Sequence, residues 1–150
     1  MIDDKDADFN EYFAIYLPAN QTLATLGEWL TQRMPTATLS ADGIVSVARR
    51  TQSPSLLRAT LDATPAIRAE VIARAKRGNA ALRAALRPAM QRLDLEFSDE
   101  RAKFDDLCDV FRALTAMPGA VGVVESDADS FVEFFFGESE GALAAVDMAD

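Results

Sequence analysis

The sequence predicts an α+β fold of mixed α/β character, in which a mostly antiparallel sheet of about six strands carries helices on one face. Residues 12–17 and 93–97 are rich in strand-forming side chains. Residues 23–34 and 104–114 place leucine and phenylalanine at helical spacing. Asp42-Gly43 is a strong signal for a tight hairpin between two further strands. Strands and helices mixed in this way along one chain are typical of an α+β domain.

In the first part of the chain, a strand over residues 12–17 and a helix over residues 23–34 each end at a proline. Proline has no amide hydrogen to donate, and it disfavours helical backbone in the residue before it. Asp42-Gly43 predicts a two-residue type I′ turn, because both positions of that turn need positive φ. The turn would join strands over residues 36–41 and 44–49.

Residues 54–87 are predicted as two or three short helices. Ser53-Pro54 and Thr64-Pro65 each resemble a helix N-cap followed by proline at the first helical position. Gly78-Asn79 interrupts the helical pattern and Pro88 ends it. The apolar faces of these helices are shallow, because many of their residues are alanine.

The stretch from Met90 to Gly137 holds most of the aromatic core. Ser98 is a plausible N-cap for a helix that follows the strand over residues 93–97. Strands over residues 120–124 and 131–136 come next, and the alanine-rich tail favours a short final helix. The apolar stripe of the long helix consists of Phe104, Leu107, Cys108, Phe111 and Leu114.

Residues 12–49 and 92–136 both follow the order strand, helix, strand, strand, which predicts two β-α-β-β units. A length of 150 residues suits one globular domain over residues 1–150. Residues 1–10 and 138–150 are expected to be mobile acidic termini.

Composition excludes several classes of chemistry. The chain has no histidine, which excludes Ser-His-Asp and Cys-His catalysis and histidine-ligated zinc within it. Its single cysteine cannot form an intrachain disulfide. No apolar run approaches the roughly 20 residues that span a bilayer, and the acidic N-terminus lacks the features of a signal peptide. We therefore expect a cytoplasmic protein without a membrane partner, and its arginine- and alanine-rich composition suggests a bacterial origin.

The net charge of −9 is unevenly distributed. Residues 1–48 hold seven acidic and two basic side chains, residues 49–92 hold two and ten, and residues 93–150 hold fifteen and three. A basic segment therefore lies between two acidic ones. The basic residues are interpreted first as solvated side chains, since exposed ion pairs contribute only about 0–1 kcal/mol each. The alternative is a site for nucleic acid or an acidic partner.

Two acidic clusters are candidate metal sites. Glu125, Asp127 and Asp129 do not fit a calcium loop, because Ser130 stands where glycine is needed and Phe136 where the last carboxylate is needed. A polar hairpin turn explains this cluster better.

The second acidic cluster lies on the long helix. It consists of Asp105, Asp106 and Asp109, which could hold magnesium weakly but are more typical of a solvated helix face. Cys108 lies in the apolar stripe, where structural burial is favoured over a reactive thiolate.

The last predicted strand has two different faces. One face, which should point at the helices, consists of Val132, Phe134 and Phe136. The other face consists of Phe131, Glu133 and Phe135. If helices cover only one side of the sheet, this second face is partly exposed beside Tyr12 and Tyr16. The alternatives are a second layer or a homodimer over that face, or Glu133 as a buried acid with a raised pKa.

The leading functional hypothesis is a non-enzymatic acidic protein-binding module of the inhibitor or immunity type, which masks a basic surface of a cytoplasmic toxin or enzyme. The candidate partner-binding residues are Tyr12, Tyr16, Phe131, Glu133 and Phe135, with Asp127 and Asp129 as a rim. The alternative is a homodimeric structural or secretion-chaperone-like subunit, and third comes a magnesium-dependent enzyme that uses Asp105, Asp106 and Asp109. We expect no bound metal or cofactor. Direct nucleic-acid binding is not expected, because the basic segment lacks interleaved aromatic residues.

Overall fold

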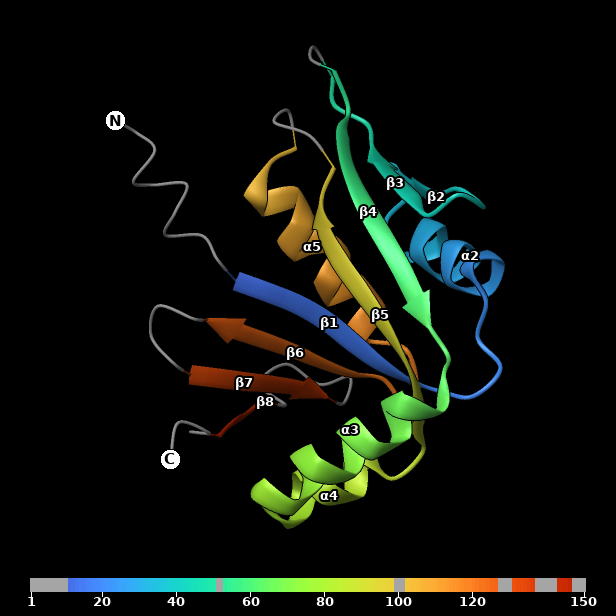
Figure 1. The fold of residues 1–150 in the computed structure, drawn as a ribbon. Coiled ribbons are helices and arrows are strands. Elements are labelled where there is room, and N and C mark those ends of the chain that lie inside the picture. The colour runs from blue at the N-terminus through green and yellow to red at the C-terminus, as the bar shows by residue number, and fades with distance from the viewer. Residues whose placement is uncertain (1–10, 51–52, 99–101, 127–130, 137–142, 147–150) are drawn as a thin grey trace.

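The computed structural model describes residues 11–50, 53–98, 102–126, 131–136 and 143–146, which form one sheet with helices against it (Figure 1). In chain order the elements are β1 (Glu11–Pro18), α2 (Leu23–Arg33), β2 (Ala37–Leu39), β3 (Ile44–Val47), β4 (Ser55–Asp62), α3 (Pro65–Arg77), α4 (Ala80–Leu86), β5 (Ala89–Phe97), α5 (Phe104–Thr115), β6 (Val121–Ser126), β7 (Phe131–Phe136) and β8 (Leu143–Val146).

The strands lie in the order β2-β3-β4-β5-β1-β6-β7-β8, and every neighbouring pair is antiparallel. The predicted α+β fold with an antiparallel sheet is therefore confirmed. The described residues hold eight strands rather than about six, and the two additional strands are β4 and β8. The tail was expected to contain a short helix, but Leu143–Val146 pairs with β7 as the edge strand.

The largest difference from the expected elements is β4. Ser53-Pro54 was taken as a helix start, but the following residues form a strand in which Leu57 and Ala59 are buried while Arg58 and Thr60 are exposed. This alternation with period two is the pattern of a half-buried strand. The other two signals are confirmed: α3 begins at Pro65, and Gly78-Asn79 separates α3 from α4. Asn79 also caps α4, because its side chain accepts a hydrogen bond from the Leu82 amide at 2.9 Å.

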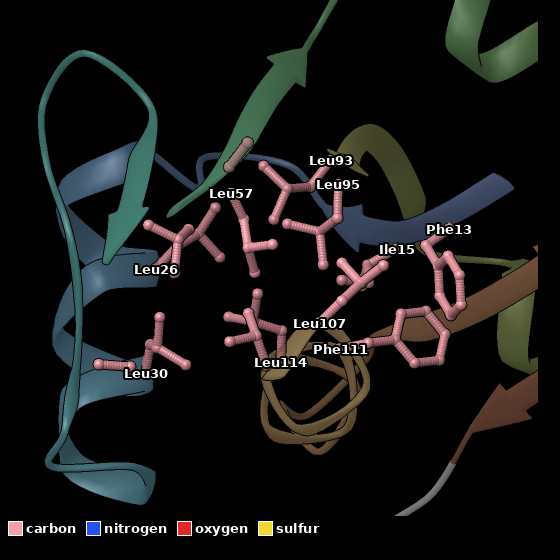
Figure 2. Close-up of a cluster of buried hydrophobic side chains, with 14 of the residues drawn as sticks. Phe13, Ile15, Leu26, Leu30, Leu57, Leu93, Leu95, Leu107, Phe111 and Leu114 are labelled. Atoms are coloured by element: carbon pink, nitrogen blue, oxygen red, sulfur yellow. The ribbon is translucent and has the colours of Figure 1, made fainter. Parts of the chain in front are cut away.

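One face of the sheet packs against α2 and α5. Leucines of α2 and α5 meet the inward residues of the central strands in a continuous core (Figure 2). This core includes Phe13, Ile15, Leu26, Leu30, Leu57, Leu93, Leu95, Leu107, Phe111 and Leu114. The predicted stripe of α5 is largely confirmed, although Phe104 at the start of the helix remains 37% exposed.

The opposite face packs against α3 and α4 over β1, β6 and β7. Ile67 and Val71 of α3 and Leu82 and Leu86 of α4 form a second core with the sheet. The sheet residues in this core include Ala14, Tyr16, Val121, Val123, Val132 and Phe134. The expectation that helices cover only one face is therefore wrong. In Figure 1, α5 lies behind the central strands and the α3–α4 pair lies at one end of the sheet.

The described elements repeat one order along the chain: β1-α2-β2-β3-β4 is followed, after α3 and α4, by β5-α5-β6-β7-β8. The repeat does not extend to equivalent positions in the sheet. The first strands of the two units, β1 and β5, pair at the centre. In the first unit the last strand, β4, lies beside this pair, whereas in the second unit the strand that follows the helix, β6, does.

The predicted hairpin between β2 and β3 is confirmed, but its turn differs. Four residues, Ser40–Gly43, connect the strands, and only Gly43 has positive φ, at +86°. The Gly43 amide donates to the Ser40 carbonyl at 3.0 Å, and the Gly43 carbonyl accepts from Ala59 at 2.7 Å. A glycine in the left-handed region at the end of a longer loop is the other common hairpin solution.

Candidate functional site

A network of charged side chains joins α3 to the sheet. Arg92 of β5 lies at its centre, with Nη1 2.5 Å from Glu70 Oε1, Nε 2.9 Å from Asp94 Oδ1 and Nη2 3.8 Å from Asp62 Oδ2. Tyr12 of β1 donates its hydroxyl to Asp94 at 2.6 Å. The Arg92 side chain is only 19% exposed, so these contacts are shielded from solvent.

The network continues through the fully buried Tyr16 of β1. Its hydroxyl donates to Glu70 and accepts from Arg74 Nε at 2.6 Å. Arg74 Nη2 also lies 2.9 Å from Glu125 Oε1 on β6. The guanidinium carbon of Arg74 is 5.8 Å from the ring centroids of both Tyr16 and Phe134. One helix is thereby tied to three strands.

These contacts fix the protonation states of the network. Burial raises the pKa of Tyr16 well above its usual value, Arg74 opposes this shift and the bond to Glu70 adds to it. Burial also raises the pKa of Tyr12, and the bond to Asp94 adds to it. For Arg92, burial would lower the pKa, but the neighbouring Asp94, Tyr12 and Glu70 outweigh it and raise the pKa. The network thus holds neutral phenols and charged guanidinium groups at neutral pH, which suits a structural role. We call this network the clamp; it consists of Tyr12, Tyr16, Asp62, Glu70, Arg74, Arg92, Asp94 and Glu125.

The structure separates residues that were expected to share one face. Ile15 pairs with Gly122, which pairs with Phe135, so Phe135 lies on the α5 side of the sheet. Glu133 lies on the same side, because it pairs with Val124 and Val124 pairs with Phe13. Tyr12 and Tyr16 are on the opposite side, in the clamp under α3. The expected grouping of the tyrosines with this β7 face is therefore wrong.

The other predicted contact residues also have defined positions or lie outside the described part. Phe135 is partly buried, and its ring centroid lies 5.6 Å from that of Phe111 at an angle of 90°. Glu133 is half-buried on β7. Asp127 and Asp129 lie outside the described residues, as does the side chain of Phe131.

The three aspartates of α5 do not converge. Asp106 turns inward, where its Oδ2 lies 2.7 Å from Arg49 Nη1 and 2.5 Å from Ser55 Oγ. Asp105 and Asp109 are exposed. Among the described residues, no three acidic or cysteine side chains come together as a metal site. Cys108 is half-buried against the first core, in agreement with a structural role.

An exposed aromatic surface lies where β5 ends and α5 begins. We call it the aromatic corner and define it by Phe97, Phe104, Asp105 and Asp109. Phe97 is 42% exposed and Phe104 is 37% exposed, although the Phe104 ring also lies edge-on to Phe13 at 6.0 Å. Asp105 and Asp109 are exposed on the first two turns of α5. Two exposed basic side chains are close by: Lys103 precedes α5, and Arg112 Nη1 lies 3.7 Å from Asp109 Oδ1.

Sequence patterns placed both phenylalanines of the corner in the core. Phe97 continues the buried alternation of Leu93 and Leu95, and Phe104 begins the apolar stripe of α5. Their positions in the elements could have predicted their exposure, because the last residue of a strand and the first residue of a helix lie at the rim of a core.

Two hollows are lined by residues of the described part of the chain. One, of about 650 Å³, lies between α2 and the edge strand β2, where Glu28 is the one charged lining residue. The other, of about 560 Å³, lies at the start of α3 and is lined by Thr64, Arg68, Met90 and Gln91 among others. Neither hollow borders the aromatic corner.

Comparisons with protein-family models, with curated proteins and with solved structures find no match to this chain. No helix in the described part has the length and apolar character needed to cross a bilayer.

Proposed function

We propose that this chain is a non-enzymatic acidic protein-binding module of the inhibitor or immunity type. It would neutralise a cytoplasmic toxin or enzyme by masking a basic surface of that partner. The observation that carries the proposal is the aromatic corner, where the end of β5 and the first two turns of α5 expose two phenylalanines and two aspartates. Aromatic anchors next to acidic groups complement a basic surface that has an apolar centre.

The charge of the whole chain supports the same partner. Outside residues 63–88 the chain holds 23 acidic and nine basic side chains. An excess of one sign accelerates the encounter with an oppositely charged protein, and the acceleration falls as salt screens it. Contact at the aromatic corner would therefore combine electrostatic steering with apolar burial.

The test is retention of host proteins on the immobilised chain, compared between two charge variants. In the first variant Asp105 and Asp109 become lysine, and in the matched control Glu28 and Asp42 become lysine. All four side chains are exposed and each variant changes the net charge by the same amount, so only the location differs. We expect the wild type and the control to retain a basic protein. The affinity of the corner variant for that protein should be lower by a factor of at least about ten.

A second variant separates the apolar contribution from the charge. Phe97→Ser should increase the dissociation rate of the partner about tenfold, because anchor residues act mainly on dissociation. The association rate should change little, since no charge is altered. Equal retention by the wild type and the corner charge variant, or no retained basic protein, would refute the proposal.

A further inference from the structure

The helical hairpin of α3 and α4 has the opposite charge from the rest of the molecule. Residues 63–88 contain six basic side chains and one acidic side chain, Glu70. Glu70 forms an ion pair with Arg92 and accepts a hydrogen bond from Tyr16 beneath the hairpin. The outer surface of the hairpin therefore presents no carboxylate of its own.

The basic residues divide into internal and external groups. Arg74 points inward to Glu125, and Arg68 donates to the backbone carbonyls of Arg87 and Ala89 at 3.1 and 2.9 Å. The exposed members are Lys76, Arg77, Arg83 and Arg87. Of these, Lys76, Arg83 and Arg87 have no carboxylate within salt-bridge distance among the described residues. Lys76 and Arg77 lie in the last turn of α3, Arg83 lies in the last turn of α4 and Arg87 is the C-cap residue of α4. Cations at these positions interact favourably with the helix dipoles.

Two exposed apolar side chains belong to this part of the molecule, Ile72 on α3 and Met90 at the start of β5. Ile72 is 46% exposed and stands one helical turn from both Arg68 and Lys76, so the three project along one stripe of α3. Met90 is 45% exposed. It lines the hollow of about 560 Å³ at the start of α3 together with Arg68. The exposed Ile72 thus lies between two basic residues of α3, and one of them, Arg68, borders the hollow.

We propose that the outer face of the α3–α4 hairpin is a docking surface for an acidic protein segment that carries apolar side chains. The exposed lysine and arginines would meet the carboxylates, and Ile72 and the Met90 hollow would receive the apolar residues. This surface is distinct from the aromatic corner, which is built from β5 and α5, and the proposal does not depend on the function proposed above.

The apolar residues favour an acidic protein over a nucleic acid. Phosphate groups need only cations, and base stacking needs aromatic side chains, yet the hairpin contains no aromatic residue and exposes a large aliphatic one at its centre. The overall charge of −9 opposes the approach of any polyanion, so short-range apolar burial must contribute to affinity. Binding should weaken as salt concentration rises, without disappearing.

The test uses fluorescence anisotropy with three labelled probes of equal length: a glutamate peptide with leucine at every fourth position, an all-glutamate peptide and an oligothymidylate. We expect the leucine-containing peptide to bind about tenfold more tightly than the other two. Arg83→Glu/Arg87→Glu should weaken this peptide about tenfold, and Ile72→Ser about fivefold. In the matched control, Arg58→Glu/Arg112→Glu, the two arginines are also exposed but lie on β4 and α5, and its affinity should stay within about twofold.

Several results would overturn the proposal. Tighter binding of the oligothymidylate would assign the surface to nucleic acid. Equal loss of affinity in the hairpin and control variants would show a nonspecific charge effect, and no binding of the leucine-containing peptide would remove the site. Light scattering measures whether the wild type and the Arg83→Glu/Arg87→Glu variant form dimers. If only the wild type dimerises, the hairpin face binds a second copy of the chain, and the proposal is contradicted. Circular dichroism confirms that each variant is folded.

Discussion

At the scale of single residues, Arg92 organises the junction between α3 and the sheet. Its guanidinium group contacts Glu70, Asp94 and Asp62, and its side chain is 19% exposed. Removing one partner of a shielded charge cluster leaves the others without compensation, which costs more than the cluster contributes as a whole. The clamp is therefore a sensitive point of the fold.

We expect Arg92→Met to lower the free energy of unfolding by about 2–4 kcal/mol. Arg112→Met is the matched control, because Arg112 is 78% exposed and lies 3.7 Å from Asp109, and it should change stability by less than about 0.5 kcal/mol. Urea denaturation measures both. Equal effects of the two substitutions would show that the clamp contributes nothing.

The two tyrosines of the chain predict a loss of stability at high pH. Their pKa values are raised in the folded protein by burial, while in the unfolded chain tyrosine ionises near pH 10. The folded state therefore keeps these protons when the unfolded state loses them. The corresponding stability is fully present below about pH 10 and is lost as pH rises toward the folded-state pKa values.

Denaturant titrations between about pH 8 and pH 11.5 test this prediction. Above pH 10 each tyrosine should reduce the free energy of unfolding by up to about 1.4 kcal/mol per pH unit. The double variant Tyr12→Phe/Tyr16→Phe should be less stable at pH 8, because it lacks the hydroxyl bonds, but its pH dependence should be shallower. Identical slopes for the two proteins would mean that the phenols do not remain protonated.

At the scale of elements, the α3–α4 hairpin completes the second core. Without it, the β1, β6 and β7 residues on that face would be open to solvent, including the fully buried Tyr16 and Phe134. The hairpin therefore covers an apolar surface and is not a peripheral addition. Its short apolar face, supplied by Ile67, Val71 and α4, suffices because the clamp adds polar contacts at its edge.

Two phenylalanines provide a direct comparison of covered and open positions. Phe134→Ala should reduce the free energy of unfolding by about 3–5 kcal/mol, since the side chain is fully buried beneath the hairpin. Phe97→Ala should cost less than about 1.5 kcal/mol, since 42% of Phe97 is exposed. Thermal or urea unfolding measures the stability of both variants. A small effect at Phe134 would contradict the second core.

Close packing between α5 and β6 depends on Gly122. A Cβ atom there would lie 2.2 Å from Thr115 Cγ2 and 2.6 Å from Phe111 Cζ, so alanine would force α5 away from the sheet. We expect Gly122→Ala to lower the free energy of unfolding by about 1–3 kcal/mol. Calorimetry measures the effect, and a variant as stable as the wild type would show that the helix can move at no cost.

At the scale of the whole molecule, local sequence signals predicted most of the helices and strands. The positions of the candidate site residues depend instead on pairing between strands that are distant in sequence. Thr64-Pro65 predicts the start of α3 correctly and Gly78-Asn79 predicts its end, because caps, prolines and glycines act within a few residues. Ser53-Pro54 misled because the same dipeptide also precedes a strand, and the alternation of Leu57 and Ala59 was the better signal.

The candidate site could not be read from the sequence in the same way. Tyr16 and Phe135 are each on an alternating strand, but only the register through β6 shows that they lie on opposite faces. The cover over Tyr16 comes from α3, about fifty residues away in sequence. We therefore propose the aromatic corner, rather than β7, as the contact surface.

The most direct test of the proposed binding surface is photo-crosslinking from two exposed apolar positions. A photoreactive amino acid replaces Phe97 in the aromatic corner or Ile72 on the α3–α4 hairpin, and the crosslinked host proteins are identified by mass spectrometry. The two positions are similarly exposed, at 42% and 46%, but lie on surfaces of opposite charge. We predict that position 97 captures a basic protein that position 72 does not. Capture of that protein from position 72 alone, or from neither position, would contradict the proposed function.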